Sequence, residues 1–229
     1  MSRRKSTLWR SLNWPNRISI FRLILIAPFV ILVLNQNDPD WRPGGVPWPR
    51  YAAFGVFVLM AVSDAVDGLL ARKLHARTRL GAILDPLADK ALIFFSVVLL
   101  AMRRFAVPGY QIDNWVVVAV VGKDLWIVAG FLVLYLVTDR FRSHATVFGK
   151  AATVGLCVLI PAVLLGPELD ALLDGLGTWL MLGLEALVTG LCVLAAVTYT
   201  RVGLRFAHEQ GKPLDNAPPE PGPGNGPDS

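Results

Sequence analysis

Charged residues are scarce in this sequence of 229 residues, and cysteine is scarcer still. Only 17% of the residues are Asp, Glu, Lys or Arg, whereas 54% are hydrophobic. Soluble domains carry about 25% charged residues, so this composition excludes an ordinary soluble protein. The two cysteines, Cys157 and Cys192, lie far apart within apolar segments. That spacing does not suit a zinc or redox motif and favours a packing role for both.

Long apolar segments dominate the chain instead. Each is about 20 residues long, which is the length a helix needs to cross the hydrocarbon core of a bilayer. Helices are expected because lipid cannot satisfy open backbone groups, and the segments are too continuously apolar for barrel strands. The predicted fold class is therefore all-α, a polytopic membrane protein with six transmembrane helices. The segments lie near residues 18–35, 50–71, 82–102, 114–137, 147–166 and 178–200.

Lys and Arg residues are concentrated in alternate connections between these segments. Cytoplasmic loops of membrane proteins carry an excess of both residues, so the pattern predicts a multi-pass protein of the cell membrane with both termini in the cytoplasm. The net charge of +5 then reflects topology and attraction to anionic membrane lipids, and no nucleic-acid partner is needed to explain it. The basic set comprises Arg3, Arg4, Lys5, Arg10, Arg17, Arg72, Lys73, Arg77, Arg79, Arg140, Arg142, Lys150, Arg201, Arg205 and Lys212.

The two ends of the chain differ in composition from the apolar middle. Residues 1–13 are basic and are expected either to lie along the cytoplasmic membrane face or to form a disordered tail. The C-terminal end of the chain is dominated by Pro and Gly and is expected to form a disordered tail. The predicted organisation is a basic N-terminal segment over 1–13, a six-helix membrane domain over 14–207 and a tail over 208–229.

Charges inside the apolar segments are the most informative residues. Each costs at least about 2.5 kcal/mol at the bilayer centre, so each needs a partner or a function. Four of the acids lie within one short run, residues 62–90. The cations are Arg22, Lys90 and Lys123, and the acids are Asp64, Asp67, Asp85, Asp89, Asp124 and Glu185.

Helical geometry groups the residues of this run on shared faces. At about 100° per residue, Asp64 and Asp67 share a face with Gly68, Ala71 and Arg72. The two small residues leave room for a bulky ligand, and the guanidinium can engage two phosphate oxygens.

Two further carboxylates, Asp85 and Asp89, are four residues apart and also share a face. The basic stretch 73–80 is short enough to make the two helices neighbours, so four carboxylates should converge near the cytoplasmic surface. Mg²⁺ or Mn²⁺ would neutralise such a cluster and bridge phosphates, as a pyrophosphate-cleaving enzyme requires. The alternative is a cation transporter or channel, which would have no use for the face with Gly68 and Arg72.

The spacing Asp64-x2-Asp67-Gly68-x2-Ala71-Arg72-x8-Gly81-x3-Asp85-x3-Asp89 resembles the CDP-alcohol phosphatidyltransferase signature and matches it at every fixed position. The similarity extends to Trp14-Pro15-Asn16-Arg17-Ile18-Ser19, which leads to Arg22, and to Gly149-Lys150 with Thr153. The resemblance implies a six-helix homodimer around a polar cavity that opens to the cytoplasm. It also implies that Asp64, Asp67, Asp85 and Asp89 bind two Mg²⁺ or Mn²⁺ ions.

The resemblance assigns further roles around the lipid donor, CDP-diacylglycerol. Gly68, Arg72 and Thr78 would contact its CDP part, and Asp89 would deprotonate the hydroxyl of a small alcohol acceptor. The expected reaction transfers the phosphatidyl group to that acceptor and releases CMP.

Residues 84–90, with the sequence LDPLADK, resemble the branches that use glycerol 3-phosphate or phosphatidylglycerol. Glycerol 3-phosphate is the predicted acceptor, giving phosphatidylglycerophosphate, and cardiolipin synthesis from phosphatidylglycerol is the alternative. A phosphorylated acceptor needs fixed cations, for which Lys123, Lys150 and Arg201 are candidates, although Arg201 could equally anchor the topology. Phosphatidylglycerophosphate synthases usually have Arg-Glu where this chain has Lys123-Asp124.

Overall fold

The computed structural model describes residues 14–74, 81–137 and 146–210, without the side chains of residues 14–19, 65–74, 81–89, 131, 134–137 and 206–210. Within these ranges the secondary structure is helical and contains no β-strand. The predicted all-α class is therefore confirmed. The N-terminal segment 1–13 and the tail beyond residue 210 lie outside the described residues.

Six long helices correspond to the six apolar segments predicted from the sequence. Three short helices occur in the connections between them. The long helices are α2 (Trp14–Asn35), α3 (Trp48–Leu74), α4 (Gly81–Ala101), α5 (Asn114–Val137), α6 (Val147–Leu164) and α8 (Gly177–Gln210). The short ones are α7 (Gly166–Leu172) and the 3₁₀ helices η1 (Pro39–Trp41) and η2 (Pro43–Gly45).

Local chemistry explains where several helices begin and end. The Thr146 side chain caps α6 by accepting a hydrogen bond from the Gly149 N–H at 3.2 Å. A proline in the first turn of α7 separates that helix from α6, so the fifth segment ends two residues before its predicted limit of 166. Helix α8 continues to Gln210, ten residues beyond the predicted apolar segment that ends near residue 200.

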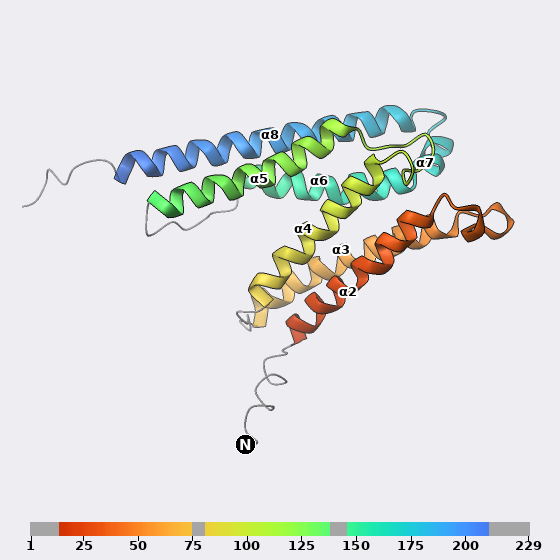
Figure 1. Cartoon of the computed structure of the whole chain (residues 1–229), viewed down its shortest axis with the longest axis horizontal. Helices are drawn as coiled ribbons and strands as arrows, with labels where there is room; N and C mark the ends of the chain where they lie inside the picture. The colour runs from red at the N-terminus through yellow and green to blue at the C-terminus, as the bar shows by residue number, and fades with distance from the viewer. Residues whose placement is uncertain (1–13, 75–80, 138–145, 211–229) are drawn as a thin grey trace, which may run out of the picture.

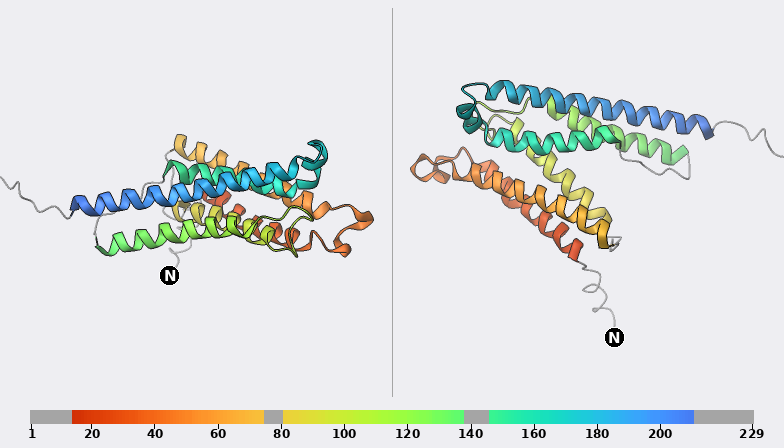
Figure 2. Two further views of the ribbon diagram at one scale, coloured as in Figure 1. Left: turned by 90° about the horizontal axis from the view of Figure 1, so that it is seen from above. Right: turned by 180° about the vertical axis from the view of Figure 1, so that it is seen from behind.

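The long helices form two groups of three. Helix α2 packs against α3 and α4, whereas α8 packs against α5 and α6. Contacts of α4 with α5 and α6, and of α3 with α6, join the groups. The two groups meet at the end of the molecule that carries α7 and diverge toward the opposite end (Figure 1 and Figure 2).

Polar contacts tie the two groups together at the α7 end. Glu168 of α7 accepts hydrogen bonds from Arg50 and from the Tyr51 hydroxyl, the latter at 2.6 Å. The Asn37 side chain donates to the carbonyl groups of Arg104 at 3.1 Å and Ala106 at 2.8 Å. These contacts fix the loops between the helices at this end.

Close packing adds to these contacts where α7 begins. A Cβ atom at Gly166 would lie 2.3 Å from the Tyr110 ring, so only glycine permits the ring to approach this backbone. Burial, followed by the neighbouring Asp170 carboxylate, raises the pKa of the Tyr110 phenol. The phenol, which is already neutral at physiological pH, therefore ionises only at a higher pH than an ordinary tyrosine.

Two stretches of the described residues are long and apolar enough to cross a membrane, Val147–Leu164 and Gly177–Arg205. Shorter apolar helices cover Ile20–Asn35 and Lys90–Ala101. Helix α5 exposes large apolar side chains along its length, including Val118 at 70%, Leu125 at 65% and Val128 at 58%. Such a continuous apolar surface is unusual for a soluble monomer.

Candidate active site

The signature residues lie on α3 and α4. Asp64, Asp67, Gly68 and Arg72 fall in the last three turns of α3, and Asp85 and Asp89 fall in the first three turns of α4. The helical placement predicted for these positions is thus confirmed. The end of α3 and the start of α4 lie at the end of the molecule opposite α7 (Figure 1).

Asp64 is the signature carboxylate whose side chain the structure describes. Its Oδ1 atom accepts a hydrogen bond from Nη1 of Arg22 on α2 at 2.7 Å. The Arg22 side chain is 1% exposed, whereas the Asp64 side chain is 47% exposed. The pair therefore joins a buried cation to a carboxylate that still faces solvent.

The remaining residues assigned to the donor and the metals cannot be placed as side chains. The structure describes only the backbone at Asp67, Gly68, Arg72, Asp85 and Asp89. Thr78 lies outside the described residues. No group of three or more His, Cys, Asp and Glu residues suited to a metal forms among the described side chains. The two-metal site consequently stays a prediction.

A second charged cluster connects α4 to α5. Asp124 Oδ1 lies 2.8 Å from Nζ of Lys123 and 3.6 Å from Nζ of Lys90. Lys123 is 10% exposed and Lys90 is 56% exposed. Two cations thus share one carboxylate, and the cluster retains one unit of positive charge.

The other two acceptor candidates are not brought into this cluster. Lys150, in the first turn of α6, and Arg201 on α8 are both exposed and form no ion pair with another described residue. Glu185 is 4% exposed and accepts a hydrogen bond from the Asp113 N–H at 3.4 Å. That contact ties α8 to the start of α5, so Glu185 has a structural role in joining these helices.

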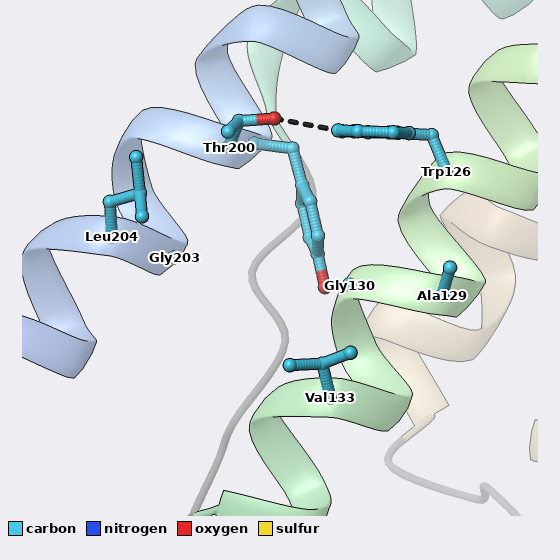
Figure 3. Close-up of a pocket in the computed structure, with 8 residues that line it drawn as sticks. Trp126, Ala129, Gly130, Val133, Thr200, Gly203 and Leu204 are labelled. Atoms are coloured by element: carbon cyan, nitrogen blue, oxygen red, sulfur yellow. Dashed lines mark hydrogen bonds between the residues drawn. The ribbon is translucent and has the colours of Figure 1, made fainter.

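A cavity of about 410 Å³ lies between α5 and α8. The Trp126 Nε1–H group donates a hydrogen bond to the Thr200 hydroxyl at 2.8 Å beside the cavity (Figure 3). None of its lining residues carries a charge, so it lacks the groups that a diphosphate requires. The lining comprises Trp126, Ala129, Gly130, Val133, Tyr199, Thr200, Gly203 and Leu204.

Sequence reasoning missed two partners within these clusters. It identified Arg22 and Lys90 as intramembrane charges but did not assign either to an acid. The available signal was the rule that such charges need partners. Spacing along one helix could not identify the acidic partners, because Arg22 pairs with Asp64 and Lys90 pairs with Asp124 on a different helix.

A family model described as CDP-alcohol phosphatidyltransferase matches residues 12–192. The chain belongs to this family. Membership in this membrane-associated family identifies the chain as a transferase and excludes the alternative of a transporter or channel.

Several relatives are similar over most of this phosphatidyltransferase. A CDP-diacylglycerol–glycerol-3-phosphate 3-phosphatidyltransferase from Aquifex aeolicus is 33% identical over 62% of the chain and 70% of the relative. The protein of the same name from Bacillus subtilis is 30% identical over 67% of the chain and 77% of the relative. A Mycobacterium tuberculosis protein provisionally named a cardiolipin synthase is 36% identical over 69% of the chain and 66% of the relative.

Proposed function

We propose that this phosphatidyltransferase joins the phosphatidyl group of CDP-diacylglycerol to glycerol 3-phosphate, giving phosphatidylglycerophosphate and CMP. The acceptor hydroxyl oxygen forms a bond to the β-phosphorus of the donor, and the bond from that phosphorus to CMP breaks. The names of the Aquifex aeolicus and Bacillus subtilis relatives support this acceptor. Family membership supports the donor.

The observation that carries the proposal is the position of the signature on α3 and α4. Its acidic residues lie near the end of one helix and the start of the next, and both of these regions lie at the end where the two helix groups diverge (Figure 2). Asp64 is 47% exposed there. A half-exposed carboxylate at this end is accessible to a ligand that enters from solvent.

Oxygen donors suit the hard cations that the family resemblance implies, and the Asp64 carboxylate fits that requirement. Asp64, Asp67, Asp85 and Asp89 would hold two Mg²⁺ or Mn²⁺ ions. Ions held there would supply Lewis-acid stabilisation of the negative charge that develops on CMP.

Other residues would bind the donor and move the proton. Arg72 is suited to engage phosphate oxygens in a forked contact, and Gly68 leaves space beside it for the CDP part. Thr78 would add a hydroxyl contact to the same part of the donor. Asp89 would accept the proton of the acceptor hydroxyl, which requires that one of its oxygens stays free.

The cluster of Lys90, Lys123 and Asp124 supports a phosphorylated acceptor. Its single unit of excess positive charge complements a phosphate monoester. The Lys123 side chain is 10% exposed, so a contact with this cation would be partly shielded from water and correspondingly strong. Lys150 and Arg201 are exposed and remain candidates for attracting the acceptor to the site.

We further propose that all six long helices cross the membrane and that two copies form a dimer. Exposed apolar side chains along α5 and the two long apolar stretches in α6 and α8 support the membrane arrangement. The Lys and Arg distribution supports a cytoplasmic position for both termini. A tag after Ser229 should therefore resist an impermeant reagent in intact cells, and labelling of that tag would contradict the orientation.

Release of CMP from CDP-diacylglycerol by the purified protein with Mn²⁺ tests the reaction. Glycerol 3-phosphate should support the fastest release, with serine and inositol phosphate close to background. Faster release with phosphatidylglycerol would favour the second candidate function, cardiolipin synthesis, which the Mycobacterium tuberculosis relative suggests. No release with any acceptor would reject the proposed activity.

A further inference from the structure

Arg22 carries a permanent charge inside a packed group of helices. Its side chain is 1% exposed, and it lies on α2 with the core residues Phe29 and Val33, which are fully buried. A buried lysine can lose its proton to avoid the penalty of desolvation, but a guanidinium cannot, because its pKa exceeds about 12. Arg22 therefore needs an anion beside it whenever the protein is folded.

Asp64 provides an anion for this buried cation. The contact at 2.7 Å between Nη1 and Oδ1 is a charge-assisted hydrogen bond that joins α2 to α3. The two partners differ in exposure, at 1% for Arg22 and 47% for Asp64. Loss of Asp64 would weaken the neutralisation of a desolvated cation, whereas loss of Arg22 would leave a carboxylate that water can still solvate.

We infer that Asp64 is a structural counter-ion of Arg22 and that Arg22 is a positioning residue, which holds Asp64 Oδ1 and thereby orients this carboxylate in the active site. The second half of this inference rests on the proposed function, whereas the first half does not. Asp64 consequently has two roles, and loss of activity in an Asp64 variant does not by itself identify a metal ligand.

The two roles predict opposite effects on stability without metal. A carboxylate that served only as a ligand would repel its acidic neighbours in the metal-free protein, so Asp64→Asn should stabilise that state. A counter-ion of buried Arg22 should instead be needed for stability. The sign of the change in melting temperature, measured in EDTA, therefore separates the roles.

A double-mutant cycle on the full-length protein in detergent with EDTA measures the coupling. We expect Asp64→Asn to lower the melting temperature by about 5–10 °C and Arg22→Met to lower it less. The double variant should melt at least as high as Asp64→Asn alone, because the buried charge is gone. An Asp64→Asn protein as stable as wild type, or more stable, would overturn the inference.

The cycle remains decisive if Asp64→Asn yields no folded protein. Recovery of folded protein when Arg22→Met is added would then support the pair. Failure of the double variant to fold, with Arg22→Met alone folded, would overturn it.

A buried arginine of similar geometry provides the matched control. Arg50 is 9% exposed and contacts Glu168, which is 38% exposed, at the α7 end. The pair Arg50→Met and Glu168→Gln should show the same asymmetry in melting temperature. Neither variant should change the response to Mn²⁺, because Arg50 lies roughly 21 Å from Asp64 along α3 at 1.5 Å per residue.

Mn²⁺ alone tests the positioning role. Because Arg22 orients Asp64, its loss should weaken metal binding, so Mn²⁺ should raise the melting temperature of Arg22→Met by about 2–4 °C less than that of wild type. Arg22→Lys, which keeps the charge, should respond as wild type does. Equal shifts in wild type and Arg22→Met would overturn the positioning role.

The same measurements separate this inference from the proposed function. If Mn²⁺ leaves the melting temperature of wild type unchanged, that result would contradict the metal site. The double-mutant cycle in EDTA would still decide whether Asp64 is a counter-ion of Arg22.

Discussion

Arg22 and Arg50 are both buried, and each contacts a partly exposed carboxylate on another helix, yet they lie at opposite ends of the molecule. The Arg50 pair joins α3 to Glu168 of α7, at the end where the two helix groups meet. The Arg22 pair joins α2 to α3, and its carboxylate, Asp64, belongs to the acidic signature that runs toward the end of α3.

The surroundings of the two pairs account for the difference in what they can do. Tyr51 also donates a hydrogen bond to Glu168, so two donors of α3 share this carboxylate of α7 and hold the two helices together. Asp64 is more exposed and lies on the helix that carries the rest of the acidic signature. Under the proposed function, a similar ion pair would therefore be structural at one site and both structural and functional at the other.

The largest expected effect concerns the acidic signature. Each of Asp64→Asn, Asp67→Asn, Asp85→Asn and Asp89→Asn should lower turnover by at least about 10²–10³-fold, because a ligand or base at the reacting phosphate is lost. CMP release and membrane insertion should be measured together, with insertion retained. Near-normal rates in three of the four variants would contradict the two-metal proposal.

Lys123→Met should have the next largest effect. A charge-assisted contact to the acceptor phosphate is worth roughly 1.5–3 kcal/mol, so the KM for glycerol 3-phosphate should rise about 10- to 100-fold with that for CDP-diacylglycerol unchanged. The variant should fold, because Lys90 remains 3.6 Å from Asp124.

Arg104→Met is the matched control for this substitution, because Arg104 lies in the loop at the α7 end and should not affect either KM. Loss of folded Lys123→Met protein would show that Lys123 only neutralises Asp124. A folded variant with unchanged kinetics would remove Lys123 from the acceptor site and favour an unphosphorylated headgroup or phosphatidylglycerol.

Glu168→Gln should affect stability without affecting catalysis. Arg50 would keep its charge in a buried position, which should lower the melting temperature by about 5–10 °C. The kcat and both KM values should stay within about twofold of wild type at a temperature where the variant is folded. A large fall in kcat would show that the two ends are coupled.

The smallest effect is expected at Gly166. A methyl group there would lie within 2.3–2.7 Å of the Tyr110 ring, and overpacking of this kind costs about 1–3 kcal/mol, or roughly 2–9 °C in melting temperature. Gly183→Ala on α8 is the matched control, because its new Cβ would meet nothing within 4 Å. Alanine should leave stability unchanged or raise it there. Equal melting temperatures for both variants would contradict the tight contact with Tyr110.

The apolar pattern predicted the helices well because each long helix contains one apolar segment. It predicted the ends of the helices less well. An apolar segment marks the residues that suit a lipid environment, whereas a helix ends where its backbone hydrogen bonds end. Helix α8 shows this, because residues 201–210 are more polar and nevertheless continue the helix. The short helix α7 was missed because its first residues, Gly166 and Pro167, follow an apolar run without interruption.

The candidate site, like the fold, was predictable only in part from the sequence. Positions on one helix follow from spacing, so the placement of Asp64, Asp67 and Arg72 on α3 could be predicted from the sequence. Contacts between helices depend on packing angles and on which face each helix presents. For that reason the partners of Arg22 and Lys90 emerged only from the structure.

The length of α8 has a practical consequence for handling the protein. Its 34 residues extend about 51 Å at 1.5 Å per residue, whereas a bilayer core is about 30 Å thick. An upright α8 that spans the membrane would carry Gln210 as much as about 20 Å beyond the hydrocarbon. An affinity tag or fluorescent protein fused beyond this helix would then stand clear of the lipid headgroups, so C-terminal fusions should leave the enzyme accessible to the proposed acceptor, glycerol 3-phosphate.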